Sequence, residues 1–345
     1  MPDEQPEVQP ALEPPDPPAT AYGLDVGTSR IVVARRQGRN YKFQSELNAF
    51  VTLPLTGLTR SALDRERIPH TVTGQEIVVY GKESEKMADL FRTETRRPMS
   101  RGFINPGEPQ GLLVLREMLA AMLGPAQSKT QKVYFSVPGQ GEDVNGSLTY
   151  HEAALLEAIT SLGYTARSIP EGLAVVYSEL LDVNCTGIGV SCGGGCSNVC
   201  LAYLAAPVFS FSIPQAGDSI DSSAAHATGE MATRVRTLKE TGFHFNGAQT
   251  DRIYHALTIY YDDMIRRLVD AIARAIRGIG RLPKLDRAIP LAVSGGTAAP
   301  AGFRERFERA LREADFPIPI SEVRLAAEPL HSTAKGALLA ALSEP

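Results

Sequence analysis

Three short glycine-containing turns carry the residues that are best suited to chemistry. The first is Asp-Val-Gly-Thr-Ser at residues 25–29, and the second is Ser-Cys-Gly-Gly-Gly-Cys-Ser at residues 191–197. The third, Ser-Gly-Gly-Thr at residues 294–297, follows an apolar run. Because glycine has no Cβ, backbone N–H groups in such turns can approach an anion closely. The three turns together therefore favour a site for phosphate groups.

Each turn could contribute a different part of such a site. Asp25 stands at the end of a short apolar run, where its carboxylate could hold a magnesium-bound water beside the phosphates. A flat base could lie against the backbone of Gly295 and Gly296. Each turn also has an ordinary explanation, because Asp-x-Gly turns close many hairpins and glycine-rich loops are common between strands.

The elements around these turns alternate between strand and helix patterns, which predicts α/β layers. Strands are expected at 132–137, 186–191, 198–205, 207–213, 289–293 and 321–325. Helices are expected at 110–124, 149–162, 171–182, 229–241, 249–279, 300–314 and 329–343. The helix at 249–279 places Leu257, Tyr260 and Met264 on one apolar stripe, which is typical of a helix half-buried against a core.

Composition limits the class of protein. A chain of 345 residues suits two domains that share a cleft. The net charge of -4 argues against a general nucleic-acid binder. The sequence lacks an apolar run of about 18 residues and a secretory signal, so we expect a cytoplasmic protein without direct membrane insertion. Residues 1–20 contain seven Pro, five acidic residues and no Lys or Arg, which predicts a disordered tail that could meet a protein partner.

Three cysteines, Cys192, Cys196 and Cys200, recur at every fourth residue across the second turn. Their spacing lacks the two pairs that are usual for zinc ligands. We expect buried, reduced thiols, because unpaired cysteine is among the most buried residue types.

The order and spacing of the three turns resemble the actin, DnaK-type chaperone and sugar-kinase superfamily, and within it the bacterial actins of the MreB and MamK type. Residues 23–28 resemble the first phosphate turn, 191–195 the second and 291–297 the adenosine turn. Other segments resemble the two connecting helices, an MreB-like stretch and a nucleoside-contacting segment, at 169–174, 331–338, 97–104 and 236–240. The resemblance extends over residues 21–343.

The resemblance implies two RNase H-like actin-fold domains of α/β class, with a nucleotide cleft between them and a small subdomain inserted in each. Domain I would comprise residues 21–168 plus 326–345, with its subdomain at about 45–108. Domain II would comprise residues 169–325, with a helical subdomain at about 218–280.

The resemblance also implies ATP and Mg²⁺ as ligands. Asp25 would hold the metal through water, and Glu171 would position the attacking water in catalysis. The nucleotide-binding residues implied are Gly27, Thr28, Ser29, Gly193, Gly194, Gly195, Lys239, Glu240, Gly295, Gly296 and Thr297. On charge pattern alone, Lys239 and Glu240 could equally form a solvated helix face, and Glu171 could simply begin a helix.

One position departs from the superfamily pattern. The second phosphate turn normally begins with Asp, and here it begins with Ser191. A hydroxyl cannot act as an anionic base, and loss of a general base typically slows a reaction by about 10²–10⁴-fold. We therefore expect slow ATP hydrolysis. Arg30, beside the first turn, could reach a phosphate and partly replace the lost metal affinity, or it could point to solvent as most arginines do.

Three functions are consistent with these features. The first is a polymerising bacterial actin-like cytoskeletal filament, assembled from copies of itself with ATP, with weak ATPase activity. The second is a non-polymerising nucleotide-binding scaffold of the same fold, which Ser191 favours. A small-molecule kinase is the third, but it would need the missing Asp and a polar insertion for its substrate.

Overall fold

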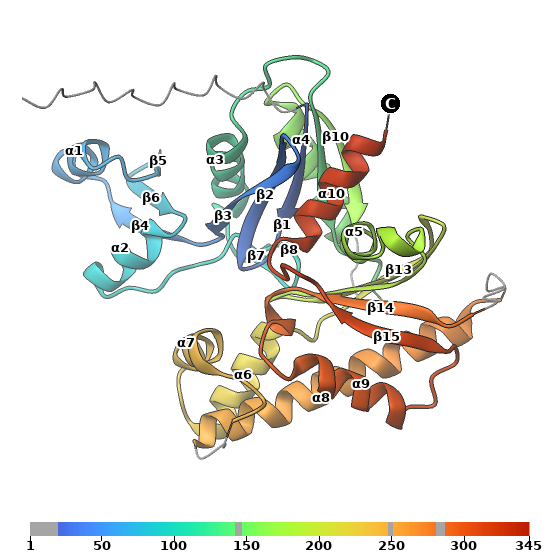
Figure 1. The fold of residues 1–345 in the computed structure, drawn as a ribbon. Coiled ribbons are helices and arrows are strands. Elements are labelled where there is room, and N and C mark those ends of the chain that lie inside the picture. The colour runs from blue at the N-terminus through green and yellow to red at the C-terminus, as the bar shows by residue number, and fades with distance from the viewer. Residues whose placement is uncertain (1–19, 142–146, 248–250, 281–286, 345) are drawn as a thin grey trace, which may run out of the picture.

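The computed structural model describes residues 20–141, 147–247, 251–280 and 287–344. The predicted tail therefore lies, except for Thr20, outside the described residues. Within them are two five-stranded sheets, each with helices against its faces (Figure 1).

The first sheet has the strand order β10-β9-β1-β2-β3. Its strands are β1 (Ala21–Val26), β2 (Arg30–Gln37), β3 (Asn40–Leu47), β9 (Lys132–Val137) and β10 (Thr165–Pro170). The first three pair antiparallel, while β1, β9 and β10 run parallel. On one face, apolar side chains of α3 (Gly111–Leu123) and α4 (Ser147–Thr160) bury the sheet.

The second sheet repeats this plan with the strand order β13-β12-β11-β14-β15. Its strands are β11 (Gly187–Cys192), β12 (Ser197–Tyr203), β13 (Ala206–Ile213), β14 (Ile289–Ser294) and β15 (Ile320–Leu325). Again three strands pair antiparallel and three run parallel. The largest core packs this sheet against α6 (Gly217–Thr228), α7 (Ala232–Gly242), α8 (Arg252–Gly278) and α9 (Phe303–Glu313).

Two helices, α5 (Glu171–Glu179) and α10 (Ser332–Ser343), lie between the sheets (Figure 1). They share one core with residues of both sheets, including Val32 and Ala202. Gly336 of α10 allows the closest approach: a Cβ there would lie 1.8 Å from the carbonyl oxygen of Ala174 in α5. Gly23 of β1 similarly makes room for α10 at Ala334. These small residues bring the two halves of the molecule together at one crossing.

A small subdomain projects from the first sheet (Figure 1). Its elements are β4 (Phe50–Pro54), α1 (Gly57–Arg65), β5 (His70–Thr73), β6 (Glu76–Tyr80) and α2 (Glu83–Phe91). The strands form a separate sheet of order β4-β6-β5 around a small core that includes Val51, Ile77 and Val79. The chain returns through the short hairpin of β7 (Met99–Ser100) and β8 (Phe103–Ile104).

Most predicted elements are confirmed, and the differences have local causes. The sequence did not predict β3, β4, α1, β5, β7, β8, β10 or α6 as elements, because these segments are short or largely polar and show no clear apolar period. In α8 the side chain at the centre of the buried face is Tyr261 rather than Tyr260. The expected helix at 300–314 begins only at Phe303, after the 3₁₀ turn η2 (Gly296–Ala298). The last residues of the predicted helix 171–182 fall in another 3₁₀ turn, η1 (Leu181–Val183).

The four cysteines are buried and unpaired, as expected. Among the described helices, none combines the length and hydropathy needed to cross a bilayer.

Candidate functional site

A cleft of about 600 Å³ lies between the two halves of the molecule. All three glycine turns line it, together with the start of α5 and the end of α7. Every residue that the resemblance implies as catalytic or nucleotide-binding lies on its wall: Asp25, Gly27, Thr28, Ser29, Glu171, Gly193, Gly194, Gly195, Lys239, Glu240, Gly295, Gly296 and Thr297. The structure thus brings residues up to 272 positions apart in the sequence (25 to 297) into one site. Their roles stay predictions.

The first and second turns face each other closely across the cleft. A Cβ on Gly194 would lie 2.4 Å from Ser29 Oγ, and a Cβ on Gly195 would lie 2.3 Å from Thr28 Oγ1. Gly195 requires glycine, because a Cβ there would also lie 2.7 Å from the backbone nitrogen of Gly102, whereas a Cβ at Gly194 would meet only the rotatable hydroxyl of Ser29. From the hairpin after the small subdomain, the N–H of Gly102 donates to Thr28 Oγ1 at 3.0 Å. The backbone amides near this contact form a compact end of the cleft that suits an anion.

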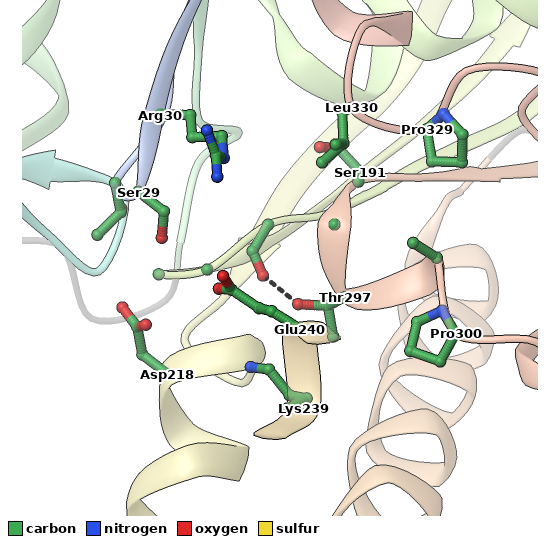
Figure 2. Close-up of a pocket in the computed structure, with 18 of the residues that line it drawn as sticks. Ser29, Arg30, Ser191, Asp218, Lys239, Glu240, Thr297, Pro300, Pro329 and Leu330 are labelled. Carbon is green, nitrogen blue, oxygen red and sulfur yellow. Dashed lines mark hydrogen bonds between the residues drawn. The ribbon is translucent and has the colours of Figure 1, made fainter. Parts of the chain in front are cut away.

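The third turn is fastened to the second. Thr297 Oγ1 donates to the carbonyl oxygen of Gly193 at 2.6 Å (Figure 2). Gly295 has a φ of +95°, and a Cβ there would lie 2.1 Å from the carbonyl oxygen of Cys192. The N–H of Gly295 donates to the carbonyl oxygen of Pro329 at 2.9 Å. The glycine is needed both for its backbone conformation and for this close approach.

The opposite end of the cleft has an apolar rim. Pro300, Pro329 and Leu330 surround it, and Glu240 points into the cleft between them and the first turn (Figure 2). Sequence reasoning had not identified the three rim residues, because isolated prolines and leucines carry no motif. A flat, partly apolar group flanked by a carboxylate suits this end.

Two carboxyl groups, the buried Glu171 and the half-buried Asp25, lie at the floor between the turns. Asp25 accepts a hydrogen bond from Ser136 Oγ at 2.7 Å, and Glu171 accepts one from Ser191 Oγ at 3.0 Å. Burial and, to a smaller extent, the negative charge of Asp25 raise the pKa of Glu171 to about 8, against the lowering effect of hydrogen bonds from Ser191 and Asn198. Burial also raises the pKa of Asp25, to about 6, against the lowering effect of Ser136. At neutral pH the pair therefore carries less than two full negative charges.

The hydroxyl of Ser191 thus donates to the residue predicted to position water. A carboxylate at this position would instead place a third negative group beside Glu171 and Asp25. The serine satisfies one oxygen of a buried carboxyl group without adding charge.

Lys239 has a different environment from the one implied by the resemblance. It lies on the cleft wall, but its ammonium is 2.8 Å from Asp221 Oδ2 and donates to the carbonyl oxygen of Gly217 at 3.1 Å. Both charged side chains are buried, with Lys239 9% and Asp221 1% exposed. The ion pair joins α7 to α6, so the lysine has a structural partner before any ligand is present.

One ion pair spans the two halves of the molecule. Arg97, in the segment before β7, places Nη1 3.0 Å from each carboxylate oxygen of Asp218. Asp218 lies in the first turn of α6, and its N–H donates to the carbonyl oxygen of Gly194 at 2.8 Å. The sequence singled out residues 97–104 as an MreB-like stretch, but the motif itself gave no reason to expect this contact.

The fit to a metal ion rests on few donors. Among the described residues, no group of three or more His, Cys, Asp or Glu side chains could hold a metal ion. Asp25 accepts its hydrogen bond from the hydroxyl of Ser136, and it could hold, through water, a metal that arrives with a polyphosphate. The thiols do not form a metal site: Cys192, Cys196 and Cys200 are buried, and burial raises the pKa of Cys192 and Cys200 to about 12.

Comparison with solved structures shows the fold. The structure titled MamK double helical filament shares 19% identity at a TM-score of 0.72, over 94% of this chain and 99% of that one. MreB 5 of Spiroplasma citri bound to AMPPNP shares 12% at 0.65, over 92% and 94%. The ethanolamine utilization protein EutJ from Carboxydothermus hydrogenoformans shares 18% at 0.55, over 95% and 92%. These are actin-fold proteins, so the predicted fold class is confirmed.

A search of the curated proteins gave no match. The sequence profile of one family, Volactin, matches residues 20–341, which covers both sheets, the small subdomain and the whole cleft. The chain therefore belongs to the Volactin family.

Proposed function

We propose that this protein is a nucleotide-dependent, polymerising actin-like cytoskeletal protein that binds ATP with Mg²⁺ and hydrolyses it slowly. The observation that carries the proposal is the meeting of three glycine turns from both halves of the molecule in one cleft. The fold supports it, because the similarity to the MamK filament structure covers nearly all of both chains. Domain I over 21–168 plus 326–345, domain II over 169–325 and a cytoplasmic location belong to the same proposal.

In the proposed complex the polyphosphate lies where the first two turns meet. Thr28, Ser29 and the amides of Gly194 and Gly195 would hold it, because these groups face one another at that end, while the N–H of Gly193 donates to the carbonyl oxygen of Cys196. The nucleoside would lie toward Gly296 and the apolar rim, within reach of Glu240. Mg²⁺, when bound, neutralises phosphate charge, and Asp25 would orient its water shell.

Slow hydrolysis is proposed from the bond between Ser191 and Glu171. In the usual arrangement a carboxylate at the first of these positions assists in polarising the attacking water. Here the hydroxyl only donates a hydrogen bond to Glu171, and Glu171 itself holds a proton over part of the neutral range. A general base that is absent or protonated costs about 10²–10⁴-fold in rate.

Self-association is proposed from the fold and from exposed apolar side chains. On the small subdomain Leu58 is 87%, Leu90 70% and Phe91 51% exposed. Single apolar residues are common on surfaces, but large ones this open on adjacent helices suit contact with another subunit. Head-to-tail contact of copies of one chain gives an open filament when the rotation between neighbours does not close a ring.

The hydrogen bond between Ser191 and Glu171 also favours a second function, a nucleotide-binding scaffold that does not polymerise. The test is a pelleting assay with negative-stain electron microscopy, using ATP, a non-hydrolysable analogue or no nucleotide, with phosphate release measured on the same samples. Filaments that require nucleotide and release phosphate slowly support the proposal. Bound nucleotide without filaments at any concentration tested would instead identify the scaffold.

A further inference from the structure

The basic side chains that line the cleft differ in whether an acidic partner already compensates their charge. Two lysine or arginine side chains line the cleft, Arg30 and Lys239. Lys239 is held by Asp221 and by a carbonyl oxygen, so its charge is already compensated. Within the described part of the chain, the guanidinium of Arg30 makes no hydrogen bond or ion pair with any residue.

The strand geometry directs Arg30 toward the cleft. Arg30 is the first residue of β2, and it follows Ser29 at the point where the two phosphate turns meet. Alternate residues of a strand point to the same face, and Val32, two positions on, also lines the cleft. Figure 2 shows the Arg30 side chain pointing into the space between Ser29 and Glu240.

Few carboxylates remain here to hold a metal cation that would offset the negative charge of a triphosphate. Ser191 replaces one carboxylate, and Glu171 is engaged by that serine. Asp25 is the floor carboxylate left to face a metal, and it already accepts a hydrogen bond from Ser136. A polyphosphate bound without other compensation would therefore meet few positive charges, and these only as partial charges on backbone amides.

We propose that Arg30 supplies part of the charge compensation for the polyphosphate that Mg²⁺ supplies in related sites, so that ATP binding tolerates removal of divalent cations. This inference rests on the proposed function of the cleft as an ATP site. A guanidinium suits the role because it stays charged and can donate two hydrogen bonds to one phosphate group.

The experiment measures the Kd of a fluorescent ATP analogue for the full chain, in Mg²⁺ and in excess EDTA. For the wild type we expect Kd to rise by less than about tenfold when Mg²⁺ is removed. Loss of a hydrogen bond to a charged group typically weakens binding by about 10- to 100-fold, so R30A should lose that much further affinity in EDTA. R30K should lie between them, because it keeps the charge without the planar fork.

R35A is the matched control, because Arg35 is an exposed arginine of the same strand that does not line the cleft. It should bind ATP as the wild type does under both conditions, and thermal unfolding should show that all variants are folded. Equal affinities of R30A and wild type in EDTA, or complete loss of wild-type binding there, would overturn the inference while leaving ATP binding in Mg²⁺ intact. Absence of binding in Mg²⁺ as well would overturn the proposed function instead.

Discussion

Ser191 places a hydroxyl beside Glu171 where the superfamily pattern has a carboxylate, and this changes the chemistry of the site. Their hydrogen bond is 3.0 Å long, and both residues are buried, on α5 and β11. The Ser191 hydroxyl donates to the ionised form of Glu171 and so lowers its pKa, whereas a further carboxylate beside it would raise that pKa. The substitution therefore exchanges basicity for a lower cost of burial.

Ser191→Asp tests this exchange. With a carboxylate restored, we expect phosphate release to rise by at least about tenfold, within the range that a general base supplies. The unliganded protein should lose about 1–3 kcal/mol of stability, because three carboxyl groups then share a buried floor. Single-turnover phosphate release and denaturant unfolding measure the two effects. Ser191→Asn, of similar shape but uncharged, is the control and should not speed release.

Glu171→Gln tests the raised pKa. A folded-state pKa of about 8, above the ordinary glutamate pKa of 4.5, means that the folded protein retains a proton that the unfolded chain releases. The stabilising contribution of this proton is complete below about pH 4.5 and is lost as the pH rises through about 8.

Because Gln resembles the protonated form, E171Q should gain stability relative to the wild type, by at least about 1 kcal/mol more at pH 9 than at pH 5. Denaturant unfolding at several pH values measures this stability difference, and Glu313→Gln, at an exposed position of α9, is the control. A difference that does not change with pH would show that burial does not perturb Glu171. E171Q should also lower phosphate release further.

At the scale of elements, the sequence predicted strands and helices well where an apolar period was present. It also predicted the three turns, because glycine runs and a flanking carboxylate are visible as letters. It could not predict the rim residues or the partner of Arg97, because those contacts depend on how distant elements pack. Lys239 illustrates the same limit: the sequence shows a cation at a family position, and only the fold shows that Asp221 holds it.

The crossing of α5 and α10 makes an element-scale prediction. Gly336→Ala would place a Cβ 1.8 Å from the carbonyl oxygen of Ala174, so the helices must separate. We expect a loss of about 1–3 kcal/mol, typical of overpacking, and weaker nucleotide binding because both halves of the cleft rest on these helices. Chemical denaturation and a binding titration measure the two effects. Gly278→Ala, at the end of α8 with open space around its Cβ, should be neutral or slightly stabilising.

At the scale of the whole molecule, the two halves touch at opposite sides of the cleft. Behind it they share the core of α5 and α10, and at the phosphate end they meet through Arg97 and Asp218. The pair is partly exposed, with 18% and 33% of the side chains accessible. Such a contact is weak enough to open and close, and it must open if the halves are to separate and release a ligand.

Arg97→Ala is therefore expected to speed dissociation of bound nucleotide by about 3- to 10-fold, the effect of removing roughly 1 kcal/mol from the closed state. Stopped-flow displacement of a fluorescent nucleotide measures the rate. Asp218→Asn should have at least this effect, because it also removes the 3.8 Å pair with Arg236, and the double variant should add little to D218N. Arg96→Ala is the control, because Arg96 pairs with Glu108 on the same side of the cleft. Unchanged rates in R97A and D218N would argue that the pair does not resist opening.

The repeated sheet plan and the glycine crossing at Gly336 have a mechanical consequence. The halves also meet where Gly139 bonds to Asn198 and Ser212, and a rotation about these contacts and the crossing produces its largest displacement at the points farthest away. In this chain those points include α1 and α2 of the small subdomain, which carry the exposed Leu58 and Leu90 (Figure 1). Binding of a nucleotide in the cleft would thus change the shape of the subunit surface, and a neighbouring copy could respond to that change without touching the nucleotide.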